Sequence, residues 1–158
     1  VVVDAPMIEG QLAGLLGDAL HQTGSIDEAE SAYERSLSNA PNNTTFLNNH
    51  AYRLAQNKHR LERAYECSSL AIQLAPDEAN FLDTHAWVLY QMERYPEALD
   101  YITQALFLAT GSDGTFWEHD GDIRSAMGDQ DGAINSWNTA LERGGNAASL
   151  KRKIEEGF

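Results

Sequence analysis

Apolar and small side chains return along this chain at helical spacing, in one segment after another, with short polar stretches between them. Within a segment the apolar residues recur three and four positions apart, the spacing of an amphipathic helix, and no segment alternates as a strand would. Nine helices are expected, at about 7–23, 26–39, 44–57, 61–74, 79–92, 95–108, 115–127, 130–143 and 147–156. The chain is therefore predicted to be all-α.

The first eight helices fall into four pairs, because small residues return about every 35 positions. The first helix of successive pairs carries Gly17, Ala51, Ala86 and Gly121. The second helix of successive pairs carries Ala29, Ala64, Ala98 and Ala133. A repeating pair of helices at this period is typical of an α-solenoid. Small side chains let two helix backbones come close, so these columns mark the expected helix crossings.

These columns divide the chain, taken as one domain over 1–158, into four repeats and a final helix. The repeats are expected at about 10–43, 44–78, 79–112 and 114–145, with a capping helix at about 147–156. Leu150 and Ile154 give the last helix one apolar edge that can lie on the fourth repeat. Ser25 and Glu28 are spaced as a capping box at the start of the second helix.

Further columns make the repeat resemble the tetratricopeptide repeat. In the first unit they are Gly17, Ala29, Tyr33, Ser36 and Pro41, and an apolar residue follows the second small position in every unit. The resemblance covers about residues 10–143. It implies a right-handed α-solenoid that binds an extended peptide or a partner helix along a concave face made by the first helices.

A narrower resemblance is to the last repeats of bacterial tetratricopeptide proteins, many of them associated with the cell envelope. This resemblance favours a location in the bacterial cell envelope or periplasm and leaves the cytoplasm as the alternative. Two positions depart from the repeat pattern. Ser68 stands at the usual aromatic position of the second unit, and Arg124 stands where the earlier units have leucine, which predicts a partly exposed final unit.

Helical spacing identifies the residues that share the expected concave side of the first helices. The predicted partner-binding residues are Asp18, Asn48, Tyr52, Asp83, Trp87, Tyr90, Gln91, Glu118 and Asp122. Together they predict an acidic groove with an aromatic centre, suited to lysine or arginine on a ligand. The alternative for Trp87 and Tyr90 is packing between repeats.

Charge narrows the class of partner. The chain has 24 acidic and 11 basic side chains, for a formal net charge of −13. This balance disfavours nucleic acid and anionic membrane surfaces and favours a neutral to basic protein segment. The alternative is that the charge serves solubility. No apolar run is long enough for direct membrane insertion.

No catalytic or metal-binding arrangement is expected, and no cofactor. His50, His85 and His119 recur because the repeat recurs, and they are interpreted as neutral packing or surface residues rather than metal ligands. Glu118 and Asp122 lie four residues apart, which fits a solvated acidic face better than a catalytic pair. The single cysteine, Cys67, lies in an apolar stripe and is expected to be a packed thiol.

The sequence therefore predicts a non-catalytic protein-interaction module, not an enzyme. The carboxylate-clamp type of tetratricopeptide repeat is not expected, because Gly14 and Asp18 stand where it needs lysine and asparagine. The alternative function is structural self-association into a homo-oligomer through the ends or the convex face. Arg124, Phe158 and the N-terminal valines are candidate contacts for that role.

Overall fold

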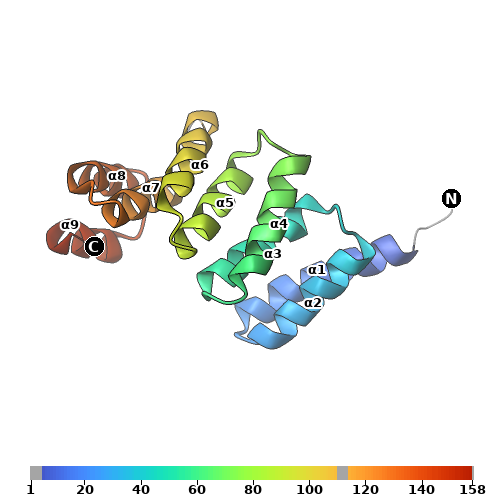
Figure 1. Ribbon diagram of the computed structural model, residues 1–158. Coiled ribbons are helices and arrows are strands. Elements are labelled where there is room, and N and C mark those ends of the chain that lie inside the picture. Colours follow the sequence, from blue (N-terminus) through green and yellow to red (C-terminus); the bar gives the residue numbers. More distant parts are fainter. Residues whose placement is uncertain (1–4, 110–113, 158) are drawn as a thin grey trace. The chain divides into compact units, whose positions relative to one another are not determined.

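The computed structural model describes residues 5–109 and 114–157, and all regular structure within them is helical (Figure 1). The helices are α1 (Ala5–Gln22), α2 (Ile26–Asn39), α3 (Thr44–Gln56), α4 (Leu61–Leu74), α5 (Ala79–Gln91), α6 (Tyr95–Leu108), α7 (Gly114–Ala126), α8 (Gln130–Glu142) and α9 (Ala147–Glu156). Each expected helix is present, with its ends displaced by no more than one or two residues, and the all-α prediction is confirmed.

The helices group into two compact units, Val1–Ala75 with α1 to α4 and Pro76–Phe158 with α5 to α9. In unit 1, α1 packs on α2 and α3 packs on α4, while α2 also touches α3. In unit 2, α5 packs on α6 and α7 on α8, with α6 against α7 and α9 against α8. The pairing follows the repeat read from the sequence. The repeat boundary expected at residue 112 lies outside the described residues.

The turns between the two helices of a pair share a left-handed residue that ends the first helix, with φ of 82° at Gly24, 51° at Lys58, 61° at Glu93 and 84° at Gly128. The turn of the second repeat has a further left-handed residue, Arg60, with φ of 45°. In each turn, the residue after the helix-ending one donates its backbone N–H to a carbonyl in the last turn of the first helix, as in Ser25 to Leu20 and Arg94 to Leu89. This is the usual helix-ending motif, for which glycine is the favoured residue. Lys58 and Glu93 keep it without glycine.

Two of the small residues in the first helices are glycines because a large ring lies against them. An added Cβ at Gly17 would come within 3.0 Å of the Tyr33 ring, and one at Gly121 within 2.4 Å of the Trp137 ring. Both rings are almost fully buried. The other two repeats have alanine in this column and a smaller residue at the ring position, Ser68 or Ile102. Small and large side chains are therefore matched within a repeat.

The last helix is held to the fourth repeat as the sequence predicts. Leu150 is fully buried in a cluster with Ala133, Trp137 and Ala140, and Ile154 packs at its edge. Asn146 caps the start of α9 by accepting the backbone N–H of Ser149 at 3.1 Å. The predicted capping box at Ser25 is wrong, because the Ser25 side chain makes no capping hydrogen bond.

Candidate functional site

An aromatic stack lies on the first helices of unit 2. The Trp87 ring of α5 is nearly parallel to the Tyr90 ring, with centroids 4.8 Å apart, and to the His119 ring of α7, with centroids 4.3 Å apart. Trp87 and Tyr90 are half-buried. Trp87 thus packs against the next repeat and also keeps part of its side chain exposed. The two interpretations made from the sequence, packing between repeats and exposure to a ligand, therefore each describe part of this residue. Burial, followed by the charge of Asp122, raises the pKa of Tyr90.

Asp83 supports this stack from below and does not line an open surface. The residue is only 5% exposed, and its Oδ1 lies 2.8 Å from Nδ1 of the equally buried His119. Of the predicted site residues, Asp83 therefore lies beneath the surface, against His119. Burial alone would lower the pKa of His119, but the Asp83 carboxylate outweighs it and raises that pKa above its usual value. His119 is thus a buried packing residue that is paired with a carboxylate.

Glu118 and Asp122 of α7 already hold an ammonium group. Lys153 of α9 places its Nζ 2.8 Å from Glu118 Oε1 and 2.7 Å from both carboxylate oxygens of Asp122. Trp137 donates its indole N–H to Asp122 Oδ1 at 2.9 Å. These two carboxylates form a lysine site on the first-helix side, as their charge suggested, but a lysine of the same chain occupies it. Lys153 belongs to the capping helix and is not among the site residues predicted from the sequence.

The predicted residues of unit 1 are partly engaged within the unit. Asp18 accepts the Tyr33 hydroxyl and also the Asn49 side-chain amide, which lies 3.2 Å from Oδ1. Its bond with Tyr33, after burial, raises the pKa of that phenol. Asn48 and Tyr52 of α3 are half-buried. Asn48 Oδ1 is buried without a partner among the described residues.

The remaining titratable candidates are structural. Burial lowers the pKa of His50 and lowers that of His85 to about 4, so both are neutral at pH 7. His85 packs edge-on against Tyr101 at 4.6 Å, and burial raises the pKa of Cys67 to about 11. Within the described ranges, no three His, Cys, Asp or Glu side chains are grouped as a metal site would need. In the same residues, no helix has the length and apolar character needed to span a membrane.

Arg124 forms an ion pair that sequence reasoning did not anticipate. Its Nε lies 2.7 Å from Asp120 Oδ2 and its Nη1 lies 3.1 Å from Asp129 Oδ2. The bond to Asp120 raises the pKa of Arg124. Its side chain is 31% exposed, which agrees with the partial exposure expected there. The i, i+4 spacing of Asp120 and Arg124 was a readable signal for this pair.

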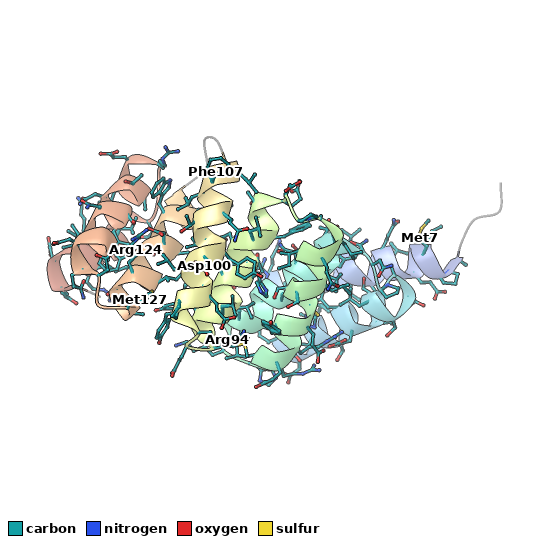
Figure 2. All side chains as sticks on the ribbon, turned by 45° about the horizontal axis from the view of Figure 1, so that its top comes forward. Met7, Arg94, Asp100, Phe107, Arg124 and Met127 are labelled. Atoms are coloured by element: carbon teal, nitrogen blue, oxygen red, sulfur yellow. The ribbon has the colours of Figure 1, made fainter. Side chains whose placement is uncertain are left out.

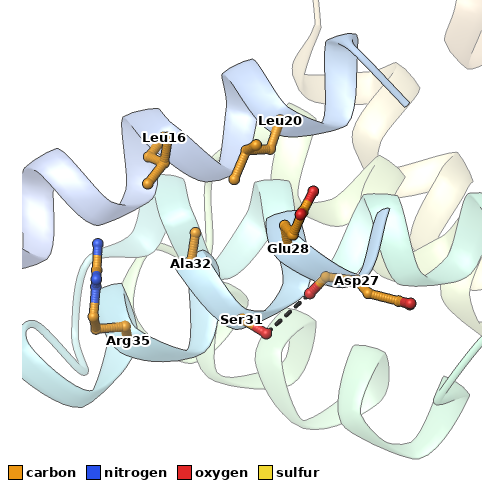
Figure 3. Close-up of a pocket in the computed structure, with 7 residues that line it drawn as sticks. All are labelled: Leu16, Leu20, Asp27, Glu28, Ser31, Ala32 and Arg35. Carbon is orange, nitrogen blue, oxygen red and sulfur yellow. Dashed lines mark hydrogen bonds between the residues drawn. The ribbon is translucent and has the colours of Figure 1, made fainter. Parts of the chain in front are cut away.

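The outer edge of α1 is apolar and exposed. Leu12 is 62% exposed, Leu15 60% and Leu16 45%. Leu16 and Leu20 overhang a groove above Ala32 and Glu28 of α2 (Figure 3). The positions that correspond to Leu12 in the second helix pair of each unit are buried, namely Phe46 of α3 and Phe116 of α7. Phe46 lies against Gly14 of the preceding helix pair in unit 1.

Two family models describe parts of this chain. Models of the tetratricopeptide repeat match residues 11–43 and 79–110. The chain is a tetratricopeptide repeat protein. Tetratricopeptide repeats are non-catalytic modules that typically mediate contacts between proteins. This chain is a module of that general kind. No curated protein matches it.

Solved structures of MamA share the tetratricopeptide fold of this chain. MamA of strain AMB-1 is 22% identical, with a TM-score of 0.70 over 94% of this chain and 80% of that one. MamA residues 41 to the end from Desulfovibrio magneticus RS-1 are 16% identical, with a TM-score of 0.73 over 84% of this chain and 74% of that one. At such identities the likeness establishes the helical-repeat fold alone.

Proposed function

We propose that this tetratricopeptide repeat protein binds a neutral to basic segment of a partner protein on its first helices. In unit 2 the surface consists of Trp87, Tyr90 and Gln91 of α5 with Glu118 and Asp122 of α7, and is called here the first-helix face. In unit 1 the corresponding residues are Asp18, Asn48 and Tyr52. Asp83 contributes indirectly, by fixing His119 beneath Trp87.

The lysine held by Glu118 and Asp122 is the observation that carries the proposal. Three carboxylate oxygens surround one ammonium group within 2.8 Å. Charge-assisted bonds of this kind are stronger than neutral ones. A lysine of a partner would find the same oxygens in the same positions once Lys153 moves aside. Lys153 is an internal competitor that lowers the affinity for such a ligand.

The aromatic part of the first-helix face supplies contact area. The Trp87 ring is fixed by stacking on both sides, so little entropy is lost when a ligand covers its exposed part. Tyr90 beside it adds a second half-buried ring. Anchored aromatics of this type dominate binding energies in protein interfaces. A ligand with an apolar side chain near a lysine would fit the rings and the carboxylates together.

Binding of short synthetic peptides, measured by fluorescence anisotropy, tests this function. The peptides carry one lysine, one glutamate or neither, beside a leucine. Lys153→Met keeps the aliphatic chain but removes the competing charge, and it should strengthen binding of the lysine peptide. Glu118→Gln and Trp87→Ala should weaken it. Leu74→Ala, which shortens an exposed apolar side chain of α4 away from the first-helix face, is the control and should leave binding unchanged.

The proposal fails if the lysine peptide binds Glu118→Gln and Trp87→Ala as tightly as the wild type, with helical content unchanged by circular dichroism. It also fails if lysine and glutamate peptides bind equally. A pull-down from the source organism, with the wild type against Trp87→Ala, then identifies the natural partner. A partner lost only with the variant is the one that uses the first-helix face.

Self-association is the second candidate function, and the exposed leucines of α1 favour it. Leu12, Leu15 and Leu16 present an apolar edge that a second copy could cover. The earlier candidates Val1 to Val3 and Phe158 lie outside the described residues. Sedimentation of the wild type against Leu12→Gln with Leu15→Gln tests this role. A wild-type mass that does not rise with concentration would exclude it.

A further inference from the structure

The outer side of each unit carries the same groove, between the second helices of neighbouring repeats. In unit 1 it runs between α2 and α4 over α3, and Leu37, Leu47 and Cys67 are among its lining residues. In unit 2 it runs between α6 and α8 over α7, where the equivalent residues are Leu106, Trp117 and Ser136. The repeat therefore places one groove at corresponding positions in the two units.

An ion pair closes the groove of unit 1. Arg63 of α4 reaches across to Glu34 of α2, with its Nη2 2.8 Å from Oε2 and its Nε 3.0 Å from Oε1. Buried His50 lies 3.3 Å from the same carboxylate. The bond to Arg63 lowers the pKa of Glu34, so the carboxylate remains charged. The space left in this groove is about 270 Å³.

The groove of unit 2 lacks this bridge. Gly132 stands at the position of Arg63 and Thr103 at the position of Glu34, so neither charge is present. The space here is about 520 Å³. The groove of unit 2, which lacks these two charges, is therefore about twice as large as the bridged groove of unit 1.

The open groove has apolar walls. Phe107 is 84% exposed, the highest value among the exposed large apolar residues of the described chain. It lines the groove with Leu106 from the same helix and Trp117 from α7. An exposed aromatic in a concave apolar surface is typical of a site that another molecule covers.

Charge and unpaired polar atoms indicate what covers it. Asp100 lies seven residues before Phe107 on the same side of α6, and both residues are labelled in Figure 2. Asp131 is also exposed and adjoins Gly132 of the groove lining, so an acid lies next to the groove on each of the two helices. Asp120, which lines the groove, is 2% exposed, and its Oδ1 has no partner among the described residues. Trp117 Nε1 is likewise buried and unpaired there. An acceptor and a donor together suit a peptide main chain.

We infer that this groove is a second docking surface, for a partner segment with one aromatic or long aliphatic side chain flanked by lysine or arginine. The apolar side chain packs against Phe107, Leu106 and Trp117. The basic residues face Asp100 and Asp131. The surface is formed by residues other than those of the first-helix face, so unit 2 can engage two segments.

An array of short peptides tests the inference, with labelled protein as the probe. Each peptide carries a central Phe, Leu or Ala, flanked by lysines or by glutamates. The wild type should bind the lysine-flanked Phe and Leu peptides, and Phe107→Ser should reduce their affinity about tenfold. Trp87→Ala is measured alongside to separate the two surfaces, because the first-helix face is proposed to bind related peptides, and Leu74→Ala, which shortens an exposed side chain of α4, serves as the control and should have no effect.

A second variant closes the groove without removing an apolar residue. Gly132→Arg with Thr103→Glu recreates the bridge of unit 1 and should also abolish the binding. A Cβ at Gly132 displaces the Asp129 cap, so its fold is checked by circular dichroism, while Phe107→Ser changes only an exposed side chain. Absence of wild-type binding, equal binding of glutamate-flanked peptides, or full binding by Phe107→Ser would each overturn the inference. Loss with Trp87→Ala alone would assign these peptides to the first-helix face instead.

Discussion

Gly121→Ala should destabilise the protein, although alanine is the better helix former. In the interior of a helix, alanine is favoured over glycine by about 1 kcal/mol. At Gly121, however, the new Cβ would lie 2.4 Å from Cδ1 and Nε1 of Trp137. Carbon atoms pack at about 3.5 Å or more, so the ring has to move by roughly 1 Å. Trp137 is 1% exposed and is held by its bond to Asp122, which resists that movement.

The magnitude follows from these opposing effects. Overpacking of a buried site costs about 1–3 kcal/mol and the helix preference offsets about 1 kcal/mol, so the net loss of unfolding free energy should be about 1 kcal/mol and at most about 2 kcal/mol. For a chain of this size, 1 kcal/mol lowers the melting temperature by about 2–4 °C. Thermal and urea unfolding followed by circular dichroism measure both quantities. Gly17→Ala is the matched control and should be close to neutral, since Tyr33 lies 3.0 Å from the added Cβ and needs to move only slightly.

A double-mutant cycle tests the cause of the loss. In the third repeat, Ala86 occupies the small position and Ile102 the ring position. Trp137→Ile gives the fourth repeat the same smaller partner. On that background Gly121→Ala should become stabilising by about 0.5–1 kcal/mol, because only the helix preference remains. The reasoning is refuted if Gly121→Ala destabilises equally in both backgrounds, or if it stabilises the wild type.

Three further predictions concern single residues. Gly128→Ala should lower stability by about 1 kcal/mol in urea unfolding, because nothing lies near the added Cβ and only the left-handed φ of 84° opposes it; an unchanged midpoint would contradict this. His85, whose pKa is lowered to about 4 by burial, stabilises the fold fully above pH 6.5 and loses that contribution as the pH falls towards 4. His85→Phe should therefore flatten the pH dependence of unfolding between pH 6 and 4, by up to about 3 kcal/mol, and an unchanged slope would count against the assignment. Cys67 is buried and its pKa is raised to about 11, so iodoacetamide at pH 8 should modify it only in urea, and rapid alkylation of the native protein would disprove its packing.

Much of the fold could be predicted from the sequence because the same apolar spacing and the same small residues recur in all four repeats. The helices lie where the apolar spacing predicted, and Leu150 seats the final helix as its position indicated. The chain also belongs to the family that its small-residue columns resemble. These features depend on local spacing and on crossings between adjacent helices, which a periodic sequence specifies directly.

The turns show where such reading was incomplete. Glycine is the residue that favours the left-handed backbone of Gly24 and Gly128, whereas Lys58 and Glu93 adopt the same backbone without being glycine. There the packing of the helix pair imposes the conformation. A sequence preference can be overridden in this way when neighbouring contacts determine where both helices begin and end.

The candidate site likewise has features that the sequence predicts and features that only tertiary contacts determine. Spacing alone placed Trp87, Glu118 and Asp122 on the first helices, and the charge of the chain indicated a basic ligand. Only the tertiary structure brought Lys153 from the end of the chain onto the two carboxylates. Only it buried Asp83 beneath the aromatic stack, against His119 of the next repeat. Helical periodicity determines which face a residue occupies, but long-range packing determines which charge it meets there and whether solvent can reach it.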